Sequence, residues 1–274
     1  MLLSVSKNIF RENIYTGNFL VSVSSPLEFR VYEDLIRQYL PVGVGSGFID
    51  SYVVSVREGS FAFFNDGCGA FYRSDVVLKE DVMALVSRHA EYLFQRNGCY
   101  SVHSGGVVVG GEALLLAGRV GVGKTSLTLE LAKSGYGVLS TDRVLIKRNE
   151  VISGSHYVNS QLDRGSVFGD DFYYVNDEVR VGLLVYPFLR DASLQWRKLA
   201  YPENITRFAN QIFYFLDEFP RLLVGSEVPF VTPSSVYDRG VVFDYAKDLV
   251  KNLDCYVVSG RKEEVAKWIR SMLR

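Results

Sequence analysis

Gly118-Arg119-Val120-Gly121-Val122-Gly123-Lys124-Thr125 matches the pattern G-x-x-x-x-G-K-[ST] and decides how the rest of the chain is interpreted. The apolar residues 113–117 before it are typical of a buried strand. Residues 126–133 after it are typical of a helix, which Gly135 would end. A strand, a glycine-rich loop and a helix in this order form the context that a phosphate-binding P-loop needs. The sequence therefore predicts a nucleoside triphosphate site.

Each position of this stretch has a predicted role in that site. Glycines let backbone N–H groups turn inward around phosphate oxygens, and the helix N-terminus adds the positive end of a dipole. Lys124 would reach the β- and γ-phosphates, and the Thr125 hydroxyl would ligate Mg²⁺. ATP is the expected nucleotide, and GTP stays open because such loops bind phosphates rather than bases. The predicted nucleotide contacts are Gly118, Arg119, Val120, Gly121, Val122, Gly123, Lys124, Thr125 and Ser126.

Composition excludes several classes of protein. The chain has a net charge of −1 and lacks a basic tract, so neither nucleic acid nor an anionic membrane is an expected partner. Its 3 cysteines are scattered, which argues against a disulfide framework or a zinc site. The first residues lack the apolar run of a signal peptide, and every apolar stretch is too short to span a bilayer. We therefore expect a cytoplasmic protein.

The length is typical of one large domain or two modest ones, and we place the expected boundary near residue 100. Residues 1–100 are predicted to form a smaller α+β region that contributes to acceptor binding. Alternating apolar residues and the turn Asn65-Asp66-Gly67 predict its strands. The expected strands are 19–24, 49–56, 59–64 and 70–72, and the expected helices are 26–39 and 79–96.

Residues 101–274 are predicted to form the α/β domain that carries the nucleotide site. Gly110-Gly111 joins two apolar runs, 107–109 and 113–117, and indicates a hairpin that leads into the glycine-rich loop. An antiparallel hairpin at this point departs from the simplest all-parallel nucleotide-binding sheet. The further expected strands are 136–141, 179–186 and 255–258, and the further expected helices are 203–224 and 263–273.

A carboxylate and a histidine are the main candidates for chemistry. Asp142 follows a short strand, and a carboxylate at the end of a neighbouring strand can hold Mg²⁺ or take the proton of an acceptor hydroxyl. His103 lies just before the hairpin. The weaker candidates are Asp170 and Asp171 as further metal or acceptor contacts, Arg164 and Arg190 as phosphate contacts, and His89 and His156, which we expect to be structural.

Three segments carry a shared pattern. They are Val102-His103-Ser104-Gly105-Gly106, Leu114-Leu115-Leu116-Ala117-Gly118, and Ser134-Gly135-Tyr136-Gly137-Val138-Leu139-Ser140-Thr141-Asp142-Arg143-Val144. Together these segments resemble the HPr kinase/phosphorylase family. The C-terminal segment, Cys255-Tyr256-Val257-Val258-Ser259-Gly260 with its helix, resembles smaller kinases related to that family. Residues 1–100 carry no specific match.

The resemblance implies a P-loop kinase core with a mixed β-sheet, related to phosphoenolpyruvate carboxykinase. It also implies Mg²⁺-dependent phosphorylation of a hydroxyl, often a serine, and relatives of this family often form homo-oligomers. His103 matches the family histidine, and Asp142 matches the second member of an acidic pair whose first position here is Thr141. Because that pair is broken, the reverse phosphorylase activity is not carried over.

We therefore expect a kinase with Lys124, Asp142 and His103 as its catalytic residues. The expected acceptor is a hydroxyl-bearing small molecule or a serine peptide. A GTPase-like nucleotide switch is the alternative, although neither D-x-x-G nor N-K-x-D follows residue 125. The chain lacks the motifs that are typical of ABC-type and motor ATPases. The intact Gly123-Lys124-Thr125 argues against a third possibility, a binding or scaffold module that has lost catalysis.

Overall fold

The computed structural model describes residues 10–16, 19–25, 40, 50–57, 60–64, 71–72, 86–87, 90–91, 93–155, 178–215 and 239–273. The chain divides into two compact units. The C-terminal unit comprises Cys99–Phe215 and Asp238–Arg274, and the described residues before Cys99 belong to the N-terminal unit. Among the described residues, no helix is both long enough and apolar enough to cross a membrane.

The N-terminal unit contains a five-stranded sheet in the order β1-β2-β3-β4-β5. Its strands pair antiparallel except for β2 and β3, which are parallel. The expected strands are confirmed, and β1 was not predicted. The expected helix 26–39 lies outside the described residues; within 79–96, the described residues from 86 onward are helical. The strands are β1 (Phe10–Thr16), β2 (Phe19–Ser25), β3 (Asp50–Arg57), β4 (Ser60–Phe64) and β5 (Phe71–Tyr72).

The C-terminal unit is an α/β structure built on an eight-stranded mixed sheet. Strand β7 (Glu112–Ala117) is antiparallel to β6 (Cys99–Val109) and parallel to β11 (Val179–Leu189), which is in turn parallel to β13 (Asp254–Gly260). The prediction of an α/β fold with a mixed sheet is thus confirmed. The other strands are β8 (Gly137–Ser140), β9 (Arg143–Lys147), β10 (Glu150–Gly154) and β12 (Gln195–Lys198).

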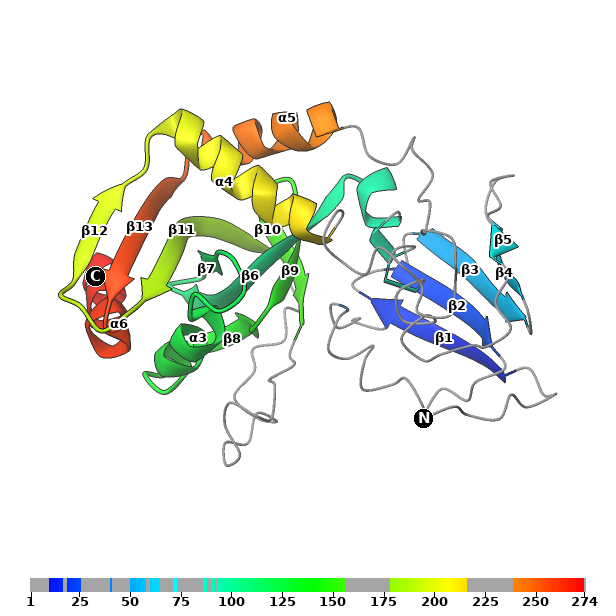
Figure 1. Ribbon diagram of the computed structural model, residues 1–274, viewed down its shortest axis with the longest axis horizontal. Helices are drawn as coiled ribbons and strands as arrows, with labels where there is room; N and C mark the ends of the chain where they lie inside the picture. The colour runs from blue at the N-terminus through cyan, green and yellow to red at the C-terminus, as the bar shows by residue number, and fades with distance from the viewer. Residues whose placement is uncertain are drawn as a thin grey trace. The chain divides into compact units, whose positions relative to one another are not determined.

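Part of this sheet closes on itself. The sheet runs β10-β9-β6-β7-β11, and β10 also pairs with β11 through Glu150 with Arg180 and Val151 with Val179. These strands therefore form a closed ring of pairings, which removes their exposed edges. Strands β13 and β12 extend the sheet beyond β11 (Figure 1).

The predicted hairpin before the glycine-rich loop is confirmed. Val109 of β6 pairs with Glu112 of β7, so the turn is the two residues Gly110 and Gly111. Their φ angles are 57° and 85°, the left-handed values that a type I′ turn requires and that glycine adopts without strain. The hairpin is longer than predicted, because β6 begins at Cys99.

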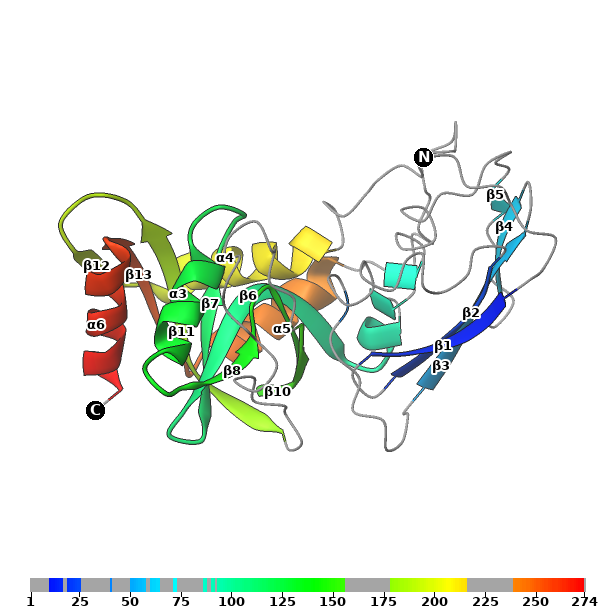
Figure 2. The same ribbon diagram turned by 90° about the horizontal axis from the view of Figure 1, so that it is seen from below.

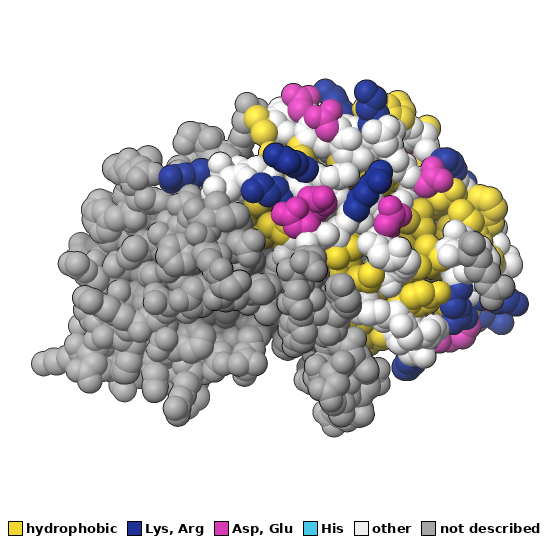
Figure 3. Space-filling view, turned by 180° about the vertical axis from the view of Figure 1, so that it is seen from behind, with side chains coloured by type: hydrophobic (Ala, Val, Ile, Leu, Met, Phe, Trp, Pro, Cys, Tyr) yellow, Lys and Arg dark blue, Asp and Glu magenta, His cyan; other side chains and the backbone are white. Residues whose placement is uncertain are grey.

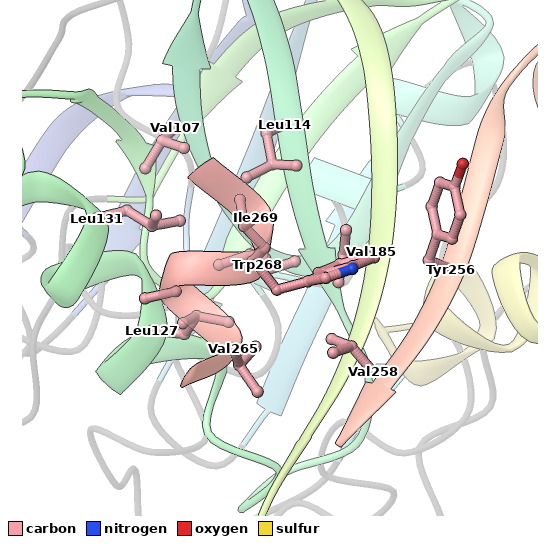
Figure 4. Close-up of a cluster of buried hydrophobic side chains, with 12 residues drawn as sticks. Val107, Leu114, Leu127, Leu131, Val185, Tyr256, Val258, Val265, Trp268 and Ile269 are labelled. Atoms are coloured by element: carbon pink, nitrogen blue, oxygen red, sulfur yellow. The ribbon is translucent and has the colours of Figure 1, made fainter. Parts of the chain in front are cut away.

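Helices cover both faces of this sheet. Helices α3 (Lys124–Ala132) and α6 (Lys262–Met272) lie side by side on one face (Figure 2). The apolar side chains of α6 pack there with Leu127 of α3, Val185 of β11 and Val258 of β13 (Figure 4). Their spacing of three and four residues gives α6 a single apolar face, as predicted for the terminal helix.

Helices α4 (Tyr201–Phe213) and α5 (Arg239–Val250) pack against each other on the other face. There Asn204 of α4 accepts a hydrogen bond from the Tyr186 hydroxyl of β11. The expected helical region 203–224 is confirmed as far as Phe215 and lies outside the described residues from 216 onward; α5 was not predicted. On the face seen in Figure 3, basic and acidic side chains are interspersed.

A glycine at the end of β10 gives a stability prediction. A Cβ atom at Gly154 would overlap the backbone carbonyl oxygen of Leu139, which cannot move aside as a flexible side chain could. We expect Gly154→Ala to lower the free energy of unfolding by about 2 kcal/mol or more in urea unfolding. Gly111→Asn is the control, because asparagine tolerates the left-handed turn and a Cβ atom at this position would meet no atom within 4 Å outside the adjacent residues. Equal stability of the two variants would contradict the prediction.

Candidate active site

The glycine-rich loop, residues 118–123, connects β7 to α3. Gly118, Gly121 and Gly123 have φ angles of 152°, 83° and 98°, which L-residues with side chains rarely adopt. Gly123 is required for a second reason, because a Cβ atom there would overlap the side chain of Leu189. The local sequence therefore produces a tight loop immediately before a helix N-terminus, which is a favourable place for an anion.

Lys124 spans this loop. Its ammonium group donates hydrogen bonds to the carbonyl oxygens of Gly118, at 2.8 Å, and Arg119, at 3.0 Å. The side chain is 5% exposed. Burial lowers the pKa of Lys124 to about 8, against the opposing attraction of the Asp142 carboxylate. A cation is thus held at the mouth of the loop, close enough to Asp142 for their charges to interact.

The loop is tied to the end of β8. The Thr125 hydroxyl donates a hydrogen bond to the carbonyl oxygen of Thr141 at 3.2 Å. Asp142 is the next residue, so the structure brings Lys124, Thr125 and Asp142 together although the chain between them forms a helix and a strand. The Asp142 side chain is 44% exposed, which leaves it open to a ligand.

His103 of β6 holds the Asp142 carboxylate from the protein side. Its Nε2 donates to Oδ1 at 3.2 Å, and the ring is only 1% exposed. Partial burial raises the pKa of Asp142, but the hydrogen bond from His103 and the charges of His103 and Lys124 outweigh it and leave the pKa below its usual value. Asp142 is therefore ionised at neutral pH, and its orientation is fixed.

A serine that the sequence interpretation missed shapes the turn that carries Asp142. The Ser140 hydroxyl donates to the carbonyl oxygen of Arg143 at 2.7 Å. The same hydroxyl oxygen accepts hydrogen bonds from the backbone N–H groups of Asp142, at 3.2 Å, and Arg143, at 2.9 Å. Ser155 adds a second acceptor for the Arg143 N–H at 3.0 Å. A serine two residues before a candidate carboxylate is typical of such turns and was the available signal.

Aromatic residues at the end of α4 surround His103 and were also missed. The Tyr214 ring stacks on the His103 ring with centroids 3.9 Å apart and planes 18° apart, and Phe215 contacts it edge-on. The guanidinium of Arg143 is fully buried over Phe215, at 4.2 Å from the ring centroid, and its Nε donates to Ser101. Burial lowers the pKa of Arg143 to about 9. No short-range pattern links these residues.

The structure places Arg190 beside the glycine-rich loop. The backbone N–H of Leu189, the preceding residue, donates to the carbonyl oxygen of Val122 at 3.1 Å. The Arg190 N–H donates to Gly260 at the end of β13. The remaining sequence candidates lie outside the described residues: Arg164, Asp170, Asp171, His89 and His156.

The donor set suits Mg²⁺ held jointly with a phosphate ligand. Thr125 and Asp142 supply a hydroxyl and a carboxylate on adjoining segments. Among the described residues, no group of three or more His, Cys, Asp or Glu side chains could form a cage of protein ligands. Mg²⁺ usually takes one or two carboxylates and completes its shell with water and phosphate oxygens, so Thr125 and Asp142 fit this ion.

No family model matches the chain, and no curated protein matches it. A solved structure, the Hpr(Ser) kinase/phosphatase from Coxiella burnetii, is similar with 11% sequence identity and a TM-score of 0.27. The match covers 63% of this chain and 89% of that chain. A TM-score of 0.27 does not establish a shared fold.

Burial of Lys124 makes the free energy of unfolding depend on pH. The pKa is about 8 in the folded protein and 10.5 for an ordinary lysine, so between these values the unfolded chain binds more protons. Stability therefore rises with pH over this range, by about 3 kcal/mol from this residue. Urea unfolding at pH 7.5 and 10.5 should show this rise for the wild type relative to Lys124→Met. A parallel pH dependence in both proteins would contradict it.

Proposed function

We propose that this protein is a Mg²⁺-dependent kinase that transfers the γ-phosphoryl group of a nucleoside triphosphate to a hydroxyl acceptor. The observation that carries the proposal is the convergence of Lys124, Thr125 and the His103–Asp142 pair at one glycine-rich loop. A phosphate-binding loop alone would serve many functions. A fixed, ionised carboxylate beside it supplies what phosphoryl transfer to a hydroxyl requires.

The loop residues would bind the phosphates. The N–H groups at the start of α3 and the Lys124 ammonium offer donors to the β- and γ-phosphate oxygens, and they concentrate positive charge where negative charge spreads in the transition state. Thr125 and Asp142 would hold Mg²⁺, directly or through water. The ion would supply charge neutralisation on the phosphate oxygens when bound.

Asp142 would also act on the acceptor. One carboxylate oxygen, Oδ1, accepts the hydrogen bond from His103, and the exposed part of the side chain can accept the proton of the attacking hydroxyl. His103 would hold the carboxylate in place, and Tyr214 would in turn hold the His103 ring. The acceptor would be a small hydroxyl compound or a serine of a peptide.

Phosphorus NMR tests the proposal. The protein is incubated with Mg²⁺–ATP and a pool of small hydroxyl compounds and serine peptides, with Lys124→Ala as the control. We expect a new phosphoester resonance with the wild type only, and dividing the pool identifies the acceptor. Release of inorganic phosphate alone, faster with GTP than with ATP, would favour a nucleotide switch and contradict the kinase.

A further inference from the structure

The strands beside the glycine-rich loop differ in the side chains they carry. Strand β7, which leads into the loop, lies between β6 and β11 (Figure 1). On the β6 side are His103 and, at the end of β8, Asp142. If these residues act on the γ-phosphate, as the proposed function states, the nucleoside end of the ligand lies on the β11 side.

Strand β11 rises beside the loop on that side. Val185 pairs with Leu116, after which β7 ends at Ala117 while β11 continues to Leu189. Leu189 is fixed against the loop by its backbone hydrogen bond to Val122 and by the close packing of its side chain on Gly123. Phe188, one residue earlier, is a large apolar residue that is 52% exposed.

Arg190 adds a planar cation next to this ring. Its guanidinium carbon lies 5.8 Å from the centroid of the Phe188 ring. The same guanidinium donates hydrogen bonds to the side chains of Gln195, at 3.1 Å, and Ser259, at 3.2 Å. Ser259 is the register partner of Phe188 in β13, so the aromatic ring and the guanidinium belong to one side of the sheet. The arrangement is held by the strands rather than by a free loop.

We propose that Phe188 and Arg190 bind the purine base of the nucleotide, which stacks on the Phe188 ring. This inference rests on the proposed function, because it assigns the nucleoside part of the same site. An exposed aromatic ring beside an arginine is a suitable surface for a nucleobase, since every base has a π-face and the guanidinium can stack or donate at its edge. The phosphates would reach the loop while the base occupies the end of β11.

Calorimetric titration can separate the base from the phosphates. Wild type, Phe188→Ala and Phe188→Leu are each titrated with Mg²⁺–ATP and with Mg²⁺–tripolyphosphate, which lacks the nucleoside. We expect Phe188→Ala to raise the Kd for ATP about tenfold and to leave the Kd for tripolyphosphate unchanged. Phe188→Leu keeps apolar bulk without the π-face and should give an intermediate loss. Arg190→Gln should also weaken ATP selectively.

Trp196→Ala is the matched control, because Trp196 is 53% exposed and lies on β12, which is separated from β7 by β11 and β13. The Trp196→Ala variant should bind Mg²⁺–ATP and Mg²⁺–tripolyphosphate with the affinities of the wild type. An unchanged ATP affinity in Phe188→Ala, or an equal loss for ATP and tripolyphosphate, would overturn the base site. Failure of the wild type to bind either ligand would instead overturn the proposed function on which it rests.

Discussion

Lys124→Ala is expected to reduce phosphoryl transfer by about 10²–10³-fold or more, because it removes the cation whose ammonium spans the loop. That charge is buried before any ligand binds, so water screens its attraction for a phosphate less than it would at the surface. The loss should appear both in nucleotide affinity and in kcat. The measurement is the initial rate of phosphoester formation with a saturating acceptor.

The fold should survive this substitution. Burial lowers the pKa of Lys124, which means that the folded protein holds this cation at a cost. Lys124→Met keeps most of the volume and removes this cost, so at pH 7.5 it should unfold at a urea concentration no lower than that of the wild type. If Lys124→Ala folds normally and transfers phosphate at the wild-type rate, this loop is not the catalytic site.

Asp142→Asn is expected to lower kcat by about 10²–10⁴-fold with a much smaller change in the Kd of ATP. The amide keeps the shape of the side chain but cannot take the proton of a hydroxyl. It also loses the negative charge that His103 and Lys124 stabilise. Single-turnover rates together with equilibrium titration of ATP separate the two effects.

His103→Gln is the companion variant. It removes the ring that donates to Asp142 and stacks on Tyr214, yet it leaves the carboxylate in the site. We expect a smaller loss of kcat than in Asp142→Asn. Unimpaired turnover in Asp142→Asn would show that this carboxylate does not take part in the reaction. A larger loss of kcat in His103→Gln than in Asp142→Asn would indicate that His103, rather than Asp142, accepts the proton.

Local patterns were enough to predict the loop and the elements around it. The glycines, the apolar run and the helix formers between 113 and 133 act through neighbouring residues, and the hairpin at Gly110-Gly111 follows from turn chemistry alone. Strands β9, β10 and β12 were not predicted. Their short segments carry little periodicity, and their pairing depends on distant partners such as β6 and β13.

The surroundings of the candidate site could be predicted only in part. Asp142 and His103 could be proposed from their positions next to strands, but their hydrogen bond joins residues 39 positions apart in the chain. The place of Arg190 depends on β11 lying parallel beside β7, a pairing between distant segments. Tyr214 reaches His103 only because α4 packs across the face of the sheet. Such contacts belong to the topology and leave no local pattern.

Equilibrium titration of the wild type and Lys124→Ala with Mg²⁺–ATP tests the central claim most directly. The account predicts one nucleotide per chain for the wild type and at least tenfold weaker binding for Lys124→Ala, with both proteins folded. Binding of equal strength in the two proteins, or its absence in the wild type, would contradict a nucleotide site at the loop of residues 118–125.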